Sequence, residues 1–510
     1  MNHTPMSYIR QRSYNTLLMW SRLLSCRSES ISRGEEVMKI LLVTYWGLTN
    51  MGGIWTYMKQ LADKLSEQGH SVTLMGSHVE NNTLYLLGQN ASFDKKAFYT
   101  LLLPHLDITL FPHLHLEHGI FSFELGRYVF EGGAAVLGLE NYDVIHAQDP
   151  IASYALRRIM RRPVPLVSSV HGALSREAYY EYKGLEPELT REEYERRPIW
   201  RYFRRMEALA ARSADLIMVS SNWIGQLTQE LGVSRERIHT LPYGVNLEQY
   251  AARAAKPSPL KIGGGTKVIM YAGRLEYIKG VHVLIEALGM LQKHRSDWTC
   301  VVAGIGSLLE ELREQARQLG ILEHIRFAGK LDNIPAALSE ADIYVQPSLQ
   351  DTQPFSVTEA QLAGIAPIVA GTSGMPEMVR HGETGWIVPP GDAARLAGLL
   401  EQLLDNEELR VRTGFQAREW AQRSRSLDVM AAGTLNVYRK AISMRESVQS
   451  PAVRSTLGAE PAAGPVPGAF HPADVLNAMY PGIPLAASMR ARLPQDYSIP
   501  DPLTVLTDPK

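Results

Sequence analysis

The sequence predicts an α/β protein with two doubly wound domains, each built on a parallel sheet. Short β-branched apolar runs alternate with amphipathic segments from residue 38 onward, which is typical of βαβ units. A stretch rich in Gly, Lys and Pro at 254–267 interrupts this pattern, which then begins again. Two such domains in tandem place a crevice between them, because ligands of open α/β sheets bind beyond the carboxyl ends of the strands.

We place the first domain at residues 38–250. Residues 39–46, KILLVTYW, form the continuous apolar run of a strand buried on both faces. A Gly-rich loop follows, and residues 54–70 then form an amphipathic helix in which Gly69 is suited to the C-cap. The later strands are predicted at SVTLMG (71–76), DVIHAQD (143–149), VPLVSSVHG (164–172), ADLIMVSS (214–221) and IHTLPYG (238–244).

We place the second domain at residues 251–447, with its last helix returning to the first domain. VIMYAGRL (268–275) leads into a helix at 280–294, and CVVAGIGS (300–307) into a helix at 308–320. The further strands are predicted at IRFAGKL (325–331), ADIYVQPS (341–348), APIVAGTSG (366–374) and GWIVPPG (385–391).

Both ends of the chain differ from this body. We interpret residues 1–37 as an extension before the natural start at Met38, because RGEEVM could be encoded by a purine-rich ribosome-binding sequence followed by a start codon. A genuine extension is the alternative. Residues 448–510 are rich in Pro and Ala, and we expect this tail to be disordered.

The composition excludes several classes of protein. The chain has 510 residues and a formal net charge of -1, so its net charge does not indicate a nucleic-acid partner. Its two cysteines, Cys26 and Cys300, have no metal-type spacing and fit a reducing cytosol. No apolar run has the roughly 18 residues of a membrane span. We therefore expect a cytoplasmic protein, with a possible peripheral membrane contact at the basic and aromatic stretch 195–210.

Three loops carry candidate ligand-binding residues. Gly52 and Gly53 come just before a helix, where free N–H groups and the helix dipole favour an anion, although a tight turn without a ligand is the alternative. In GRLEYIKG, Gly273 and Arg274 end a strand and Lys279 begins the next helix. Two cations at such a turn can hold a diphosphate and stabilise its charge as it leaves.

The segment DTQPFSVTEA holds two acids, Asp351 and Glu359, on either side of a proline. If a helix begins after Pro354, the N–H groups of Phe355 and Ser356 point at the crevice. Glu359 then lies about one turn inside the helix and can accept hydrogen bonds from a ribose diol, while Asp351 reaches the hydroxyls of a sugar. No His or Cys cluster accompanies these acids, so we expect no metal site.

At this point the chain resembles the retaining glycosyltransferases of family 4, which have the GT-B architecture of two Rossmann-like domains. The matching stretches are MGGIWTY, DVIHAQDP, SVHG, LPYGVN, GRLEYIKG, VVAGIGS, IRFAGKL, DTQPFSVTEAQLAGIAPIVAG and GMPEMVRHGETGWIVPPGD. The resemblance covers residues 38 to about 445. It implies transfer of a sugar from a UDP- or GDP-linked donor to a carbohydrate or lipid-linked acceptor, with retention and with neither metal nor cofactor.

The resemblance also implies roles for particular residues. Those implied to touch the transferred sugar or the diphosphate are Gly53, His171, Arg274, Lys279 and Asp351. Glu359 matches the acid that binds the ribose, and Lys330 and Leu331 match the segment beside the base.

Four positions depart from the family pattern. Asp351 replaces the usual glutamate, Gln148 a common histidine, Ile305 a common acid and Tyr243 a usual asparagine. None of these changes removes a diphosphate contact, so we interpret the chain as active. A catalytically silent scaffold in envelope or coat assembly stays open, as does a GT-B enzyme of another nucleotide-sugar reaction. The sequence leaves the donor, the acceptor and the oligomeric state undetermined.

Overall fold

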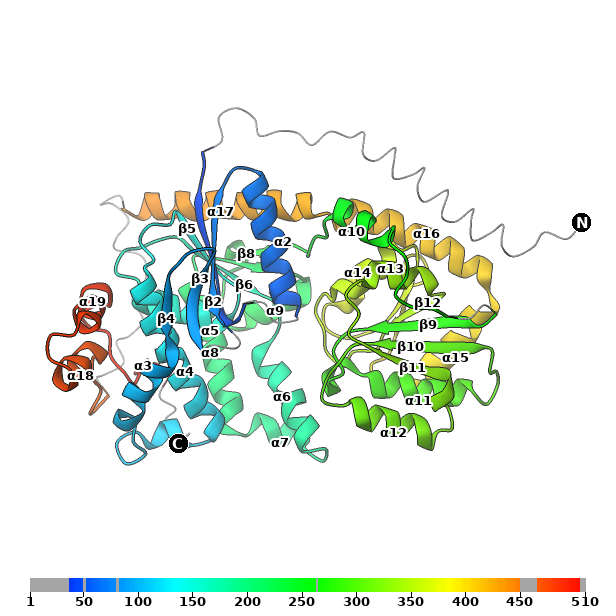
Figure 1. Ribbon diagram of the computed structural model, residues 1–510, viewed down its shortest axis with the longest axis horizontal. Coiled ribbons are helices and arrows are strands. Elements are labelled where there is room, and N and C mark those ends of the chain that lie inside the picture. The colour runs from blue at the N-terminus through cyan, green and yellow to red at the C-terminus, as the bar shows by residue number, and fades with distance from the viewer. Residues whose placement is uncertain (1–35, 49–51, 79–81, 263–264, 450–465, 505–510) are drawn as a thin grey trace, which may run out of the picture.

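The computed structural model describes residues 36–48, 52–78, 82–262, 265–449 and 466–504, so the interpretation of residues 1–37 falls almost entirely outside the described residues. Two α/β lobes lie side by side (Figure 1). Both sheets have helices on their two faces, as the alternating pattern predicts, and the fold class is confirmed.

The first sheet has eight strands in the order β4-β3-β2-β1-β5-β6-β7-β8. All neighbours are parallel except β2–β3 and β3–β4, which are antiparallel. The strands are β1 (Lys39–Gly47), β2 (Ser71–Ser77), β3 (Thr83–Leu87), β4 (Ser92–Asp94), β5 (Val144–Ala147), β6 (Leu166–Val170), β7 (Leu216–Val219) and β8 (Ile238–Thr240). The helices are α2 (Gly53–Glu67), α3 (Lys95–Leu102), α4 (His118–Leu137), α5 (Pro150–Ile159), α6 (Leu174–Leu185), α7 (Arg191–Glu195), α8 (Pro198–Ser213) and α9 (Asn222–Glu230).

The second sheet has six parallel strands in the order β11-β10-β9-β12-β13-β14. They are β9 (Lys267–Ala272), β10 (Trp298–Ala303), β11 (Ile325–Gly329), β12 (Ile343–Gln346), β13 (Pro367–Ala370) and β14 (Trp386–Val388). The helices are α10 (Leu247–Ala254), α11 (Val281–Leu291), α12 (Leu309–Gln318), α13 (Ile334–Ala337), α14 (Phe355–Leu362), α15 (Ala393–Asp405) and α16 (Glu407–Ser424). The boundary predicted at residue 250 falls inside α10, which packs against α13, so the change of domain comes before Leu247.

The long helix α17 (Leu427–Gln449) runs back along the first domain (Figure 1). Its buried apolar residues share a core with β1 and α2. The hydroxyl of Tyr438 lies 2.7 Å from Nδ1 of His146, which is buried in β5. The first domain is therefore completed by a segment that follows the second domain in sequence.

The expectation that residues 448–510 are disordered is wrong for residues 466–504. This segment forms α18 (Pro472–Met479) and α19 (Pro484–Arg492), at the end of the first domain far from the second (Figure 1). Met489, Leu493 and Ile499 are buried in the same core as α4 and α5. Few apolar residues are enough here, because the surface that receives them is already folded.

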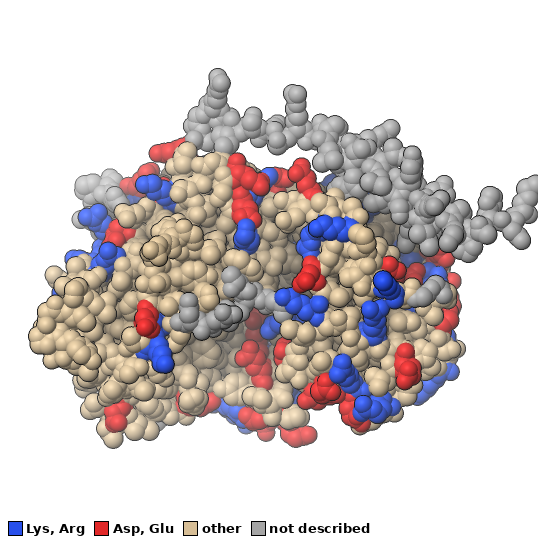
Figure 2. Space-filling view, viewed as in Figure 1, with Lys and Arg blue, Asp and Glu red and all other residues tan. Residues whose placement is uncertain are grey.

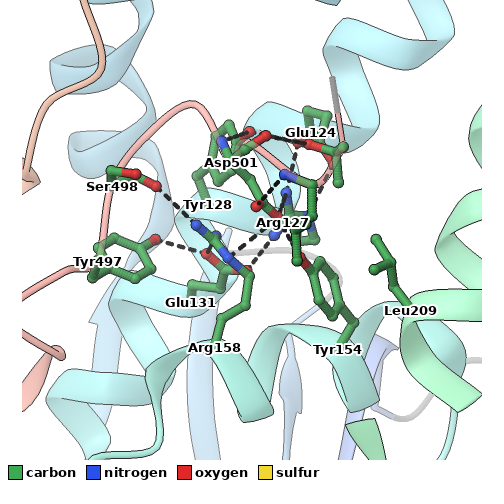
Figure 3. A network of polar contacts seen from close by, with 12 residues as sticks. Glu124, Arg127, Tyr128, Glu131, Tyr154, Arg158, Leu209, Tyr497, Ser498 and Asp501 are labelled. Carbon is green, nitrogen blue, oxygen red and sulfur yellow. Dashed lines mark hydrogen bonds and ion pairs between the residues drawn. The ribbon is translucent and has the colours of Figure 1, made fainter. Parts of the chain in front are cut away.

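A buried ionic network fastens this tail (Figure 3). Arg127 of α4 lies between Glu124 and Glu131, and its Nη2 is 3.2 Å from Oδ2 of Asp501. Arg158 of α5 contacts Asp501 at 3.2 Å and also pairs with Glu131. Burial by itself would raise the pKa of Asp501, but the two arginines outweigh it and hold that pKa below its ordinary value.

Tyrosine hydroxyls complete the network. Tyr154 donates to Asp501 at 2.7 Å, and Tyr497 of the tail donates to Glu131 at 2.7 Å. Buried charges are tolerated only where such partners surround them. The tail is thus part of the structure of the first domain, and its Asp501 adds a third carboxylate to the paired charges of α4 and α5.

Candidate active site

The candidate site lies where the loops at the carboxyl ends of both sheets meet. In the first sheet the strand order reverses between β1 and β5, and in the second between β9 and β12. Ligands of open α/β sheets bind at such switch points. Contacts between the domains lie here: Tyr180 donates to the carbonyl of Leu349 at 3.4 Å, and the rings of Tyr243 and Phe355 stack with centroids 5.4 Å apart.

Lys279 and Asp351 are brought together across the second switch point. Lys279 ends the short helix η4 (Tyr277–Lys279) after β9, and Asp351 follows β12. Their Nζ and Oδ2 atoms are 2.6 Å apart, and both side chains are largely buried. Oδ1 of Asp351 accepts a hydrogen bond from the backbone N–H of Thr352 at 3.0 Å. The predicted cation and the predicted sugar-binding acid therefore form a single polar unit.

Gly280 is required for this placement. Its backbone lies in the left-handed region at φ 67°, and a Cβ there would collide with the carbonyl of Pro347. The glycine lets the turn after Lys279 approach the end of β12. The spacing of Lys279 from Asp351 thus depends on a residue without a side chain.

Helix α14 begins at Phe355, as the sequence predicts, and Pro354 occupies its N-cap position. No side chain caps the helix there, so its N-terminus is open to a ligand within the described chain. Glu359 lies about one turn further along. Burial raises the pKa of Glu359 to about 7, against a smaller opposing effect of Arg253.

The remaining predicted residues of the second domain lie around this unit. Gly273 and Arg274 follow β9, and Arg274 is exposed. Lys330 is exposed and Leu331 half-buried in the loop after β11. That loop continues to Asp332, whose carbonyl accepts a hydrogen bond from Arg253 at 3.0 Å.

Gly52 and Gly53 lie at the start of α2. Gly52 is the N-cap of α2 and Gly53 its first residue. A Cβ at either position would meet no atom of the described chain within 4 Å. Within the described chain neither glycine is crowded on the side where a side chain would lie, which suits the approach of a phosphate to this helix N-terminus.

His171 is held by both of its ring nitrogens. Oε1 of Gln148 lies 3.1 Å from Nε2, and the hydroxyl of Tyr243 lies 2.6 Å from Nδ1. The amide nitrogen of Gln148 donates to the carbonyl of His146 at 3.2 Å, which turns its oxygen toward His171. Nε2 therefore carries the hydrogen, and Nδ1 accepts from Tyr243. Burial lowers the pKa of His171 to about 3, which keeps the ring neutral.

Two of the departures from the family pattern thus have a common explanation. Gln148 and Tyr243 both contact His171, and each supplies the polar group that one ring nitrogen needs. With both nitrogens engaged inside the first domain, a ligand can hydrogen-bond to the ring nitrogens of His171 only by replacing one of these partners. Ile305, a third departure, is exposed between two glycines of the loop after β10.

A Tyr243→Phe variant tests this arrangement. It leaves the buried Nδ1 of His171 without a donor, which costs about 1–3 kcal/mol. We expect a lower melting temperature, measured by differential scanning fluorimetry. An unchanged melting temperature would show that the bond from Tyr243 contributes nothing to the folded state.

Sequence reasoning missed Glu177, a half-buried acid in the first turn of α6. Burial raises its pKa to about 7. Lys279, Asp351 and Arg274 of the second domain also act on this carboxylate, in that order. The only available signal was its position six residues after His171, and a single acid on a helix is too common to be informative.

Glu377 forms a second contact between the domains that the sequence did not predict. Its carboxylate accepts hydrogen bonds from the backbone N–H groups of Asn222 and Trp223, at 2.8 and 2.9 Å. These groups lie at the N-terminus of α9, where the helix dipole favours a negative charge. The contact helps to fix how the two domains face each other.

Further features of the described residues concern a metal site and contacts with a membrane. Among the described residues, no group of three or more His, Cys, Asp or Glu side chains is arranged to hold a metal ion. Within the same residues, no helix is long and apolar enough to cross a membrane. Tyr202 and Phe203 of α8 are buried, so the membrane contact expected at 195–210 lacks these two aromatic side chains. On the face shown in Figure 2, charges of both signs are interspersed over the described surface.

Comparisons with known proteins show the family of the chain. Residues 51–249 match the family model described as "Glycosyltransferase Family 4", and residues 253–420 the one described as "Glycosyl transferases group 1". The chain is 29% identical over 311 residues to a glycogen synthase of Mycobacterium tuberculosis, which covers 58% of this chain and 68% of that protein. It is 26% identical over 434 residues to an MMP alpha-(1->4)-mannosyltransferase of Mycolicibacterium hassiacum, which covers 79% and 98%.

Among solved structures, the fold resembles that of Anabaena Alr3699/HepE in complex with UDP-glucose. The TM-score is 0.53 at 20% identity, and the match covers 80% of this chain and 100% of that one. A sucrose-phosphate synthase from Thermosynechococcus elongatus gives a TM-score of 0.58 at 18% identity, over 80% and 100%. At these identities the likeness concerns the fold, which is GT-B.

Proposed function

Because the chain belongs to the glycosyltransferases of family 4 and group 1, we propose that it transfers a sugar from a nucleoside diphosphate sugar to an acceptor hydroxyl, with retention at the anomeric carbon. The observation that carries the proposal is the unit formed by Lys279, Asp351 and the open N-terminus of α14 at the second switch point. Such a unit offers positive charge, backbone donors and a sugar-binding acid within one crevice.

In this proposal Lys279 and Arg274 hold the diphosphate and stabilise the charge that develops as it leaves. The N–H groups of Phe355 and Ser356 support the same oxygens. The phosphate displaces Asp351 from Lys279, and Asp351 then accepts hydrogen bonds from the transferred sugar.

The rest of the donor would lie along the neighbouring loops. Glu359 accepts from the ribose hydroxyls, and Lys330 and Leu331 lie beside the base. Gly53 lets the diphosphate approach α2, and the acceptor hydroxyl attacks the face from which the diphosphate departs. The positive charge that this step needs comes from side chains, so we propose that the enzyme requires no metal ion.

We propose a UDP- or GDP-linked donor and a carbohydrate or lipid-linked acceptor of the cell envelope. The names of the relatives support this range, since they include a glycogen synthase and a mannosyltransferase. The solved structure with UDP-glucose supports a nucleotide sugar in a fold of this kind.

Nucleotide binding tests the proposal directly. UDP, GDP, ADP and their common sugar conjugates are added to the purified chain, and the melting temperature is followed by fluorimetry. A nucleotide at about 100 times its Kd adds about 2.7 kcal/mol, which corresponds to a rise on the order of a few degrees. We expect a rise with one base, unchanged by EDTA and lost in Glu359→Ala.

The control is Glu286→Ala, which removes an exposed acid of the same domain. A rise that survives Glu359→Ala would contradict the ribose contact. The absence of a rise with every nucleotide would contradict the proposed function and favour a silent scaffold.

A further inference from the structure

Glu177 is a half-buried acid beside the crevice. Its carboxylate occupies the space where a side chain at Gly172 would lie, next to His171. No hydrogen bond or ion pair within the described residues reaches this carboxylate, whereas the neighbouring Asp351 is paired with Lys279. Helix α6 also packs against η4 of the other domain, which places Glu177 at the domain interface.

The charge of Glu177 depends on groups of the other domain. Burial, the largest effect, raises its pKa to about 7. Lys279 and Arg274 oppose this effect, while Asp351 and Glu181 add to it. Near neutral pH both protonation states are therefore populated, and a change in the neighbouring charges shifts the balance.

A nucleoside diphosphate would change those charges in one direction. Its phosphate groups would neutralise Lys279 and Arg274, the two cations that favour the ionised form of Glu177. They would also bring negative charge close to the carboxylate. Both effects favour the neutral acid.

On the premise of the proposed function, we infer that Glu177 takes up one proton from solvent when a nucleoside diphosphate enters the crevice, and that the neutral carboxyl group then hydrogen-bonds to the sugar–diphosphate end of the donor. A neutral carboxyl has one donor and one acceptor for this purpose. Its formation removes a negative charge from the place where the leaving diphosphate must be stabilised.

Calorimetric titration measures this proton. UDP or GDP, whichever raises the melting temperature, is titrated in two buffers of different ionisation enthalpy, and the difference in heat gives the number of protons bound. Glu359 would instead release protons when the nucleotide binds, because hydrogen bonds from the ribose hydroxyls favour its ionised form. Glu359 is present in both the wild type and Glu177→Gln. Its proton release therefore cancels when the proton number of the variant is subtracted from that of the wild type.

We expect the wild type to take up more protons than Glu177→Gln, by up to one, near pH 7.5. At about pH 8.5 the variant should bind the nucleotide more tightly, by about tenfold for each unit by which the ligand raises the pKa of Glu177. Glu177→Asp keeps a titrating group and should restore the uptake. Glu188→Gln, an exposed acid just after the same helix, should behave as the wild type.

Equal proton numbers in the wild type and in Glu177→Gln, with the nucleotide bound by both, would overturn the inference and leave the proposed function intact. If the wild type binds no nucleotide, the proposed function itself fails and this inference fails with it. A fall in proton uptake in Glu188→Gln as large as in Glu177→Gln would show that the proton is not specific to Glu177.

Discussion

An Arg127→Met variant is expected to lose about 3–5 kcal/mol of folding free energy. Arg127 is fully buried between Glu124, Glu131 and Asp501. Methionine fills a similar volume but leaves three buried carboxylates with Arg158 as their remaining cation. Denaturation by urea, followed by circular dichroism and tryptophan fluorescence, measures the loss.

The loss of folding free energy in Arg127→Met should depend on pH. Without Arg127 the pKa of Glu131 and that of Asp501 rise in the folded state, because Arg127 lowers both. Groups of this kind contribute stability at low pH and lose it as the pH rises through their folded pKa. The difference between variant and wild type should therefore be larger at about pH 8 than at about pH 5. Arg162→Met, at an exposed position just after α5, is the control and should change the stability by less than about 0.5 kcal/mol.

Lys279→Ala is expected to lower the turnover of the donor by about ten- to a hundredfold. A charge-assisted contact contributes about 1.5–3 kcal/mol, and each 1.36 kcal/mol of transition-state stabilisation is a factor of about ten in rate. The variant also leaves Asp351 without its partner at 2.6 Å. Release of the nucleoside diphosphate from the donor, with water or an acceptor present, measures the rate.

Lys261→Ala is the matched control, because Lys261 is an exposed lysine of the same domain. Lys279→Arg keeps the charge and should recover part of the rate. Undiminished turnover in Lys279→Ala would show that Lys279 does not stabilise the leaving diphosphate. Arg274 and the N-terminus of α14 would then be the remaining groups for that role.

The fold was largely predictable because its determinants are local. Alternating apolar and amphipathic segments specify the strands and helices, and Pro354 marks the start of α14. The pairing of Lys279 with Asp351 follows from their positions after neighbouring strands, so the sequence could place both in one crevice.

The other features depend on contacts between distant segments. The environment of Glu177 exists only once α6 lies against the second domain. His171 acquires its partners from two other loops. The tail resembled a disordered segment because its own composition cannot form a core, while the surface that receives it is built from residues about 340 positions earlier, such as Arg158 and its bond to Ser498.

The order of segments in the first domain has a consequence for synthesis on the ribosome. The second domain is contiguous from Leu247 to Ser424 and can complete its core as soon as those residues have emerged. The first domain cannot, because α17 and residues 466–504 are translated last. Until then Arg127, Glu131 and the apolar face of α4 stay incompletely covered, so the half of the protein that is made first finishes folding last.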